Sequence, residues 1–107
     1  MRRGDLVTIA VSGDYGKPRP ALVVQSDAFE AMPSVTVLLL TSEIHDAHLI
    51  RITLRPSAEN GLRAISQVMI DKAMTVPKTR VGAVIGRADA DTMTAVSVAL
   101  GRFLGVG

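Results

Sequence analysis

Short apolar runs separated by turn-forming residues occupy the first two-thirds of the 107-residue chain. The runs are rich in Val, Ile, Leu and Thr, and β-branched residues favour the pleated surface of a sheet. Polar and apolar positions alternate along residues 48–55, which predicts a strand with one face in water. The pattern predicts strands at residues 6–11, 21–25, 35–40, 49–54, 64–70, 73–76 and 81–85, with turns at residues 12–18, 59–61 and 71–72.

The last part of the chain changes to a helical period. Apolar residues recur there at intervals of three and four, at Met93, Val96, Leu100 and Phe103. We expect this stripe to pack against the sheet. Asp89 or Asp91 can cap the start of the helix, and Gly105 can end it. The whole pattern predicts one domain over residues 1–107 that is mainly β with a C-terminal helix (α+β) and barrel-like.

The composition narrows both the core and the function. Hydrophobic residues make up 48% of the chain but aromatic residues only 3%, so the core must be aliphatic. Binding of single-stranded nucleic acid by stacking usually needs several aromatic rings. The chain has no cysteine, which excludes disulfides and a thiol nucleophile and fits a reducing cytoplasm. No apolar run approaches the ~20 residues that cross a bilayer, so we expect a cytoplasmic protein without a membrane segment.

The net charge of +2 hides an uneven distribution. Residues 47–87 carry seven Lys and Arg residues against two Asp and Glu residues. Ordinary clustering of surface charge is one explanation, and a track for an anionic partner is the other. The cations available to such a track are Arg51, Arg55, Arg63, Lys72, Lys78 and Arg80.

Two segments carry candidate chemistry, although phosphate-loop, metalloprotease and nucleophile-elbow motifs are absent. Arg19 lies between two prolines, which restrict the backbone around a guanidinium that suits phosphate. Thr41 and Ser42 follow an apolar run, and their hydroxyls can donate to phosphoryl oxygens. At this point the alternatives stay open, because a local carboxylate can hold Arg19 and the hydroxyls can simply start a turn.

Together these segments resemble the MazF/PemK family of toxin endoribonucleases, the toxic halves of bacterial toxin–antitoxin pairs. The motifs that carry the resemblance are Arg3-Gly4-Asp5-Leu6-Val7, Arg19-Pro20-Ala21-Leu22-Val23-Val24, Thr41-Ser42, Asn60-Gly61-Leu62, Ser66-Gln67-Val68, Ile70-Asp71-Lys72 and Val84-Ile85-Gly86. The resemblance implies an SH3-like, twisted antiparallel barrel of the CcdB/MazF type that forms a homodimer. It also implies sequence-specific cleavage of single-stranded RNA without a metal or cofactor, and a cognate antitoxin that neutralises the enzyme.

The resemblance further implies that Arg19 and Thr41 are catalytic and that Ser42 helps to hold the substrate. We also expect substrate contacts from Lys17, Ser66, Gln67 and Asp71, with the loop at residues 12–18 beside the RNA groove.

The general base is left unassigned, because arginine is a poor proton acceptor near neutral pH. Asp71 is a nearby carboxylate that can instead pair with Lys72. His45 has suitable chemistry but matches no family motif, and we expect it and His48 to be exposed loop residues rather than metal ligands.

Two other classes of function remain open. One is a non-enzymatic DNA gyrase poison of the CcdB type, which has a related fold but has no need of a fixed phosphate-binding arginine. The other is a catalytically inactive barrel that serves as an interaction module.

Overall fold

The structure is a computed structural model that describes residues 1–10 and 17–107. Most of the turn expected at residues 12–18, and the expected strand end at residue 11, lie outside the described residues. Within the described part, six strands form one antiparallel sheet in the order β4-β5-β3-β2-β1-β6. The elements are β1 (Asp5–Ala10), β2 (Pro18–Val23), η1 (Asp27–Phe29), β3 (Ser34–Thr41), β4 (Arg51–Leu54), β5 (Ser66–Pro77), η2 (Lys78–Arg80), β6 (Val81–Arg87) and α1 (Ala90–Leu104).

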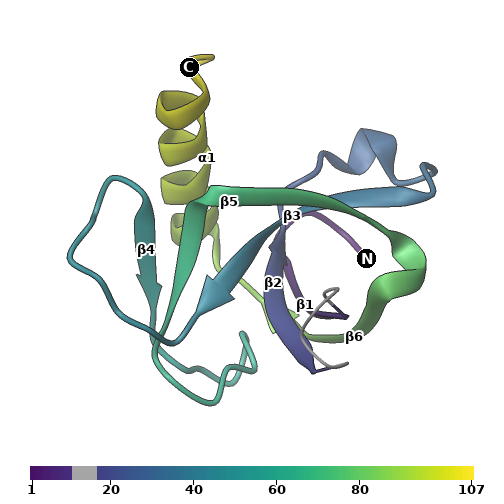
Figure 1. Ribbon diagram of the computed structural model, residues 1–107, viewed down its shortest axis with the longest axis horizontal. Helices are drawn as coiled ribbons and strands as arrows, with labels where there is room; N and C mark the ends of the chain where they lie inside the picture. Colours follow the sequence, from purple (N-terminus) through teal and green to yellow (C-terminus); the bar gives the residue numbers. More distant parts are fainter. Residues whose placement is uncertain (11–16) are drawn as a thin grey trace.

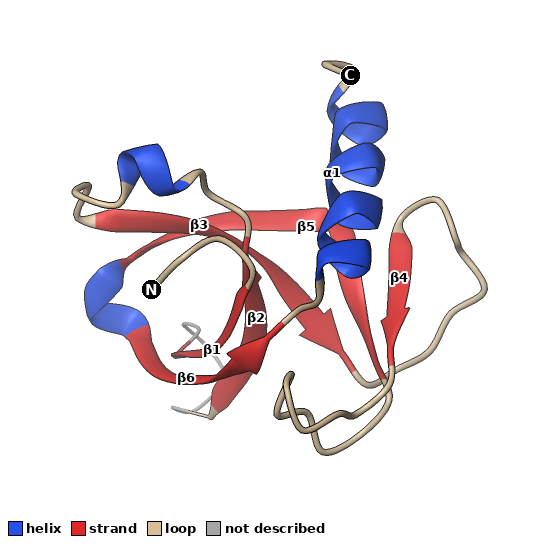
Figure 2. Ribbon diagram, turned by 180° about the vertical axis from the view of Figure 1, so that it is seen from behind, coloured by secondary structure: helices blue, strands red, loops and turns tan. Residues whose placement is uncertain are grey.

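The sheet is strongly twisted and curls on itself, but it stays open between β4 and β6 (Figure 1). This architecture confirms the expected barrel-like β fold with a C-terminal helix. Viewed from behind, α1 stands beside β4 and β5, against which it packs (Figure 2).

Both faces of the sheet are buried in aliphatic clusters, as the composition predicts. Leu6 and Leu22 lie in one cluster with Val96 of α1. Val7 and Val37 lie in the second cluster. Because successive residues of a strand point to opposite faces, the adjacent Leu6 and Val7 serve different clusters. This arrangement explains why the strands in the middle of the sheet read as continuous apolar runs.

One long strand replaces the two strands predicted on either side of residues 71–72. β5 runs through this position without a turn. Its pairing with β3 shifts there, since Leu38 faces Ala73 whereas Leu40 faces Val68. The polar pair that suggested a turn therefore marks an irregularity in the ladder, where extra residues of β5 bulge out of the pairing.

β2 begins three residues earlier than predicted and includes Arg19. Pro18 and Pro20 pair with Ala10 and Thr8 of β1, whereas the pairing of β2 with β3 covers only residues 21–23. Proline cannot donate to a ladder and is tolerated where one side of a strand is unpaired. The prolines therefore start the strand instead of preceding it.

The helix confirms both predicted ends but only part of its predicted core stripe. The Asp89 carboxylate accepts a hydrogen bond of 2.7 Å from the Thr92 backbone N–H, and Gly105 ends the helix with a φ of 72°. Val96 is fully buried, but Phe103 is 50% exposed, so the prediction that it packs in the core is wrong. It lies in the last turn of α1, beyond the part of the helix that covers the sheet. No helix in the described ranges has the length and apolarity needed to span a membrane.

Candidate active site

A cleft with a volume of about 580 Å³ lies where the C-terminal end of β3 meets the first residues of β2 and β5. Its remaining wall is the segment between β4 and β5, which lies at the bottom of the view in Figure 1, next to the end of β3. The residues that line the cleft are Thr8, Pro18, Arg19, Pro20, Leu40, Thr41, Ser42, Gly61, Leu62, Arg63, Ala64, Ser66 and Ile85. Four of the seven predicted site residues are therefore brought together, namely Arg19, Thr41, Ser42 and Ser66.

Arg19 and Thr41 approach the cleft from neighbouring strands. Ala21 of β2 pairs with Leu39 of β3, and continuing this register by two residues places Arg19 opposite Thr41. The Arg19 backbone is held by its pairing with Ile9 and by the prolines on either side. The guanidinium is thus presented from a stiff segment at the mouth of the cleft.

The Thr41 hydroxyl can both donate and accept hydrogen bonds, and the turn that follows β3 uses it as an acceptor. Its oxygen accepts a hydrogen bond of 3.1 Å from the Glu43 backbone N–H. The alternative of a hydroxyl-initiated turn is therefore correct, but it does not exclude catalysis. A threonine hydroxyl that accepts one bond can still donate its own proton. The turn also orients the hydroxyl, while the exposed Ser42 follows it into the cleft.

Asn60 shapes the opposite wall, a role that sequence reasoning missed. Its side-chain oxygen accepts from the backbone N–H groups of Ser57 and Leu62, both at 3.0 Å, and its Nδ2 donates to the Arg55 carbonyl at 2.8 Å. Asn60 is only 8% exposed. The Asn-Gly pair signalled a turn correctly, yet a polar residue that organises a loop from inside looks the same in sequence as one in water.

Gly61 lets this wall lie close to β6. Its φ is 67°, and a Cβ atom there would come within 1.9 Å of the Ile85 carbonyl oxygen. Glycine alone suits both the left-handed backbone and the close approach. The next residues, Leu62 and Arg63, consequently face the cleft.

The described part of the cleft lining contains cations and hydroxyls. Among the described residues that line it, Arg19 and Arg63 are cationic and no carboxylate is present. Hydroxyls come from Thr8, Thr41, Ser42 and Ser66, although the Ser66 hydroxyl donates to the Ala64 carbonyl at 3.0 Å. Such a surface suits a polyanion that also offers apolar groups.

The other three predicted site residues do not line the cleft. Lys17 is exposed just before β2. Gln67 is 3% exposed, and its amide is engaged by His45 and Thr53. Asp71 accepts a hydrogen bond from Arg51 and lies 3.7 Å from the Lys72 ammonium. The expected pairing of Asp71 with Lys72 is therefore present, but Arg51 is the closer partner.

The ionic environment sets the charge state of Asp71. Burial raises the pKa of its carboxyl, but the hydrogen bonds from Arg51 and from its own backbone N–H, with the charges of Arg51 and Lys72, outweigh burial. The pKa therefore lies below its ordinary value of 3.8. A carboxylate held ionised in an ion pair is poorly suited to accept a proton in catalysis.

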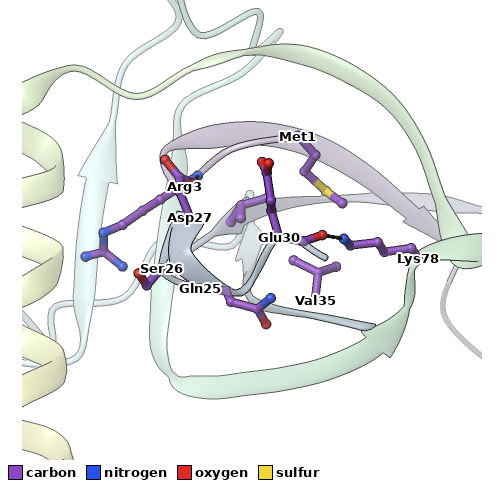
Figure 3. A pocket seen from close by; sticks show the side chains of 9 residues that line it. Met1, Arg3, Gln25, Ser26, Asp27, Glu30, Val35 and Lys78 are labelled. Carbon is purple, nitrogen blue, oxygen red and sulfur yellow. Dashed lines mark hydrogen bonds between the residues drawn. The ribbon is translucent and has the colours of Figure 1, made fainter. Parts of the chain in front are cut away.

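Several cations predicted for an anionic track are used elsewhere. The Arg51 side chain is only 12% exposed, so the prediction that this position of β4 faces water is wrong. Arg55 lines a different cleft, between β4 and the start of α1. Lys78 lies in a small pocket near the N-terminus, where its Nζ donates to the Glu30 carbonyl (Figure 3). That pocket has a volume of about 10 Å³, enough for about one water molecule.

Both histidines lie in exposed loops. His45 and His48 are exposed, as predicted, and the His45 Nε2 lies 3.6 Å from the Glu43 carboxylate. Across residues 1–10 and 17–107, no three His, Asp or Glu side chains gather so that they could hold a metal ion.

An open, twisted antiparallel sheet with one C-terminal helix is also the fold of solved MazF toxins. A family model described as the PemK-like, MazF-like toxin of type II toxin–antitoxin systems matches residues 2–104, and the chain belongs to this family. A curated relative, a probable endoribonuclease MazF of Mycolicibacterium smegmatis, is 45% identical over 99% of this chain and 98% of its own length.

Solved structures share the fold at lower sequence identity. An endoribonuclease from a mycobacterial species, solved with its cognate antitoxin, is 22% identical with a TM-score of 0.85 over 100% of this chain and 97% of that chain. The MazF-mt6 toxin of Mycobacterium tuberculosis is 23% identical with a TM-score of 0.82, covering 96% of this chain and 98% of that one. A MazE–MazF complex from Deinococcus radiodurans is 24% identical with a TM-score of 0.81, covering 100% and 97%.

Proposed function

We propose that this protein is an endoribonuclease toxin that cleaves single-stranded RNA in the cleft containing Arg19 and Thr41. The observation that carries the proposal is the convergence of an arginine, strand-end hydroxyls and a second arginine in one cleft whose described lining has no carboxylate. The 45% identical relative, which bears the name of an endoribonuclease, supports the same activity.

RNA supplies its own nucleophile for this reaction. The 2′-oxygen attacks the adjacent phosphorus, the new P–O2′ bond forms, and the P–O5′ bond breaks with its electron pair on the 5′-oxygen. The proton of the 2′-OH passes to a base, and the leaving 5′-oxygen takes up a proton. The products are a 2′,3′-cyclic phosphate and a 5′-hydroxyl. The protein has to align the attack and stabilise the negative charge that develops on the phosphoryl oxygens.

Arg19 and Thr41 suit the second task. A guanidinium can donate two hydrogen bonds to phosphoryl oxygens and stays protonated at physiological pH. The Thr41 hydroxyl, held by the turn to Glu43, can donate a third from the neighbouring strand. Both groups belong to strand ends, so little reorganisation is needed as charge develops.

Arg63 and the apolar lining suit the remainder of the substrate. Arg63 comes from the opposite wall and can contact a neighbouring phosphate, whereas Leu62 and Ile85 offer aliphatic surface to a base. RNA is thus held by arginines, hydroxyls and backbone rather than by stacked aromatic rings.

We also propose the assembly and control implied by the family. A cognate antitoxin would lay an acidic segment over the basic cleft and block access of RNA. A homodimer would place two such clefts in one groove, and the cytoplasm would supply mRNA as substrate.

The direct test incubates the purified protein with mixed-sequence RNA in EDTA and maps the ends. We expect cuts at a short sequence motif that leave 2′,3′-cyclic phosphate or 3′-phosphate ends and 5′-hydroxyls. Intact RNA combined with inhibition of DNA gyrase in a supercoiling assay would instead support a gyrase poison. Loss of cleavage on chelation alone would show that a metal is required.

A further inference from the structure

Gln67 occupies a central position behind the cleft. It lies in β5 directly opposite Thr41 of β3 on one side and Thr53 of β4 on the other. Only 3% of the residue is exposed. It therefore adjoins a proposed catalytic residue without lining the cleft.

The amide of Gln67 binds the chain that follows Thr41. Its Oε1 accepts from the His45 backbone N–H at 3.0 Å, and its Nε2 donates to the His45 carbonyl at 3.0 Å. The second N–H of the amide donates to the Thr53 hydroxyl at 3.2 Å. Both donors are thus used inside the protein, and the side chain pairs with His45 much as another peptide group would in an antiparallel ladder.

This pairing holds a segment that has left the sheet. β3 ends at Thr41, and residues 42–46 belong to no strand. The segment is tied at Thr41 by the bond from Glu43 and at His45 by Gln67. Because these ties are only a few residues apart, releasing His45 frees the turn that orients the Thr41 hydroxyl and presents Ser42.

We propose that Gln67 is a positioning residue that holds the Thr41–Ser42 turn in its reactive arrangement through His45. The proposal rests on the proposed RNA cleavage at this cleft. A displaced donor is most costly when charge develops in the transition state, so the effect falls on kcat more than on KM.

The main test compares Gln67→Met, which keeps a long side chain but removes the amide, with wild type and a matched control. The control is Thr75→Val, which breaks another side-chain bond between β3 and β5, the 2.6 Å contact of the Thr36 and Thr75 hydroxyls. We measure kcat and KM on an RNA oligonucleotide, the exchange of the His45 amide proton by NMR, and urea unfolding. Gln67→Met is expected to lower kcat by about 10- to 100-fold, leave KM near the wild-type value and speed His45 exchange. Thr75→Val is expected to leave kcat, KM and His45 exchange near their wild-type values.

Gln67→Glu adds a readout that a general loss of stability does not move. The protonated carboxyl can donate to the His45 carbonyl as the amide does, whereas the carboxylate can only accept. A glutamate pKa is ordinarily about 4.3 and rises on burial. The ratio of variant to wild-type kcat should therefore rise as pH falls. Taking the ratio removes pH effects that both proteins share. The charged residues common to both around this position are Glu43 and His45 in the loop, Arg51 in β4, Arg55 just after β4 and Asp71 in β5.

The outcomes separate this proposal from the proposed function. A fall in kcat with unchanged His45 exchange, or faster exchange with unchanged kcat, would overturn the positioning role alone. A flat pH dependence of the Gln67→Glu ratio would also count against it. If wild type failed to cut RNA at all, the proposed function would fail together with the positioning role.

Discussion

Gly86 of β6 lies against the backbone of Asn60 so closely that a Cβ atom at residue 86 would come within 2.3 Å of the Asn60 carbonyl carbon. The Arg87 N–H also donates to the Glu59 carbonyl at 2.7 Å. The loop that forms one wall of the cleft is thus fixed to β6 by direct backbone contact. Any side chain at residue 86 must push this wall away.

Gly86→Ala is therefore expected to lower the free energy of unfolding by about 1–3 kcal/mol and to reduce RNA cleavage by displacing Leu62 and Arg63. Gly105→Ala is the control, because a Cβ atom there would meet nothing within 4 Å and adds only backbone strain. Urea unfolding and cleavage assays measure both effects. Full activity in a stable Gly86→Ala variant would show that this contact does not shape the cleft.

Arg19→Ala and Thr41→Ala are each expected to reduce cleavage by at least ~100-fold, the scale for loss of one group that stabilises transition-state charge. Arg2→Ala removes an exposed positive charge outside the cleft lining and is expected to cut normally. Single-turnover rates on one RNA oligonucleotide provide the measurement. Normal rates in folded Arg19→Ala and Thr41→Ala variants would refute the site assignment.

Asp71→Asn is expected to destabilise the fold at neutral pH by about 1–3 kcal/mol, because the largely buried Arg51 loses its charged partner. The folded-state pKa of Asp71 lies below its unfolded value, so its carboxylate stabilises the fold above the unfolded pKa. This contribution is lost as pH falls through the folded pKa.

The difference in unfolding free energy between wild type and Asp71→Asn should accordingly shrink below the ordinary pKa of 3.8. Urea titrations at several pH values test this prediction. Asp46→Asn, at an exposed loop position, serves as the control. An equal difference at all pH values would contradict the role of the Arg51–Asp71 pair.

Asp89→Ala is expected to lower the free energy of unfolding, because the helix loses its N-cap hydrogen bond. The hydrogen bonds from the backbone and side chain of Thr92 hold the pKa of Asp89 below its ordinary value. Asp91→Ala is the matched control, since Asp91 lies in the first turn but does not cap the helix. Thermal unfolding of the two variants distinguishes them. Equal losses of stability in both variants would show that the N-cap hydrogen bond is not the main contribution of Asp89.

The apolar pattern predicted most of the local structure. Runs such as residues 35–40 gave strands because aliphatic side chains at consecutive positions can be buried on both faces of a central strand. The capped, periodic segment after Asp89 gave the helix. The flanking prolines and the end of an apolar run make Arg19 and Thr41 candidate site residues, and the family motifs predict their catalytic roles.

The tertiary structure decided what depends on pairing between distant segments. Whether Asp71 starts a turn or continues β5 depends on the pairing of β5 with β3 and β4, and neither this pairing nor the partner Arg51 is contained in the local pattern around Asp71. The same reason explains why Asn60 and Gln67 were not recognised as internal supports. Sequence periodicity reports which way a side chain points within its own element, but only strand register shows which residue it meets there.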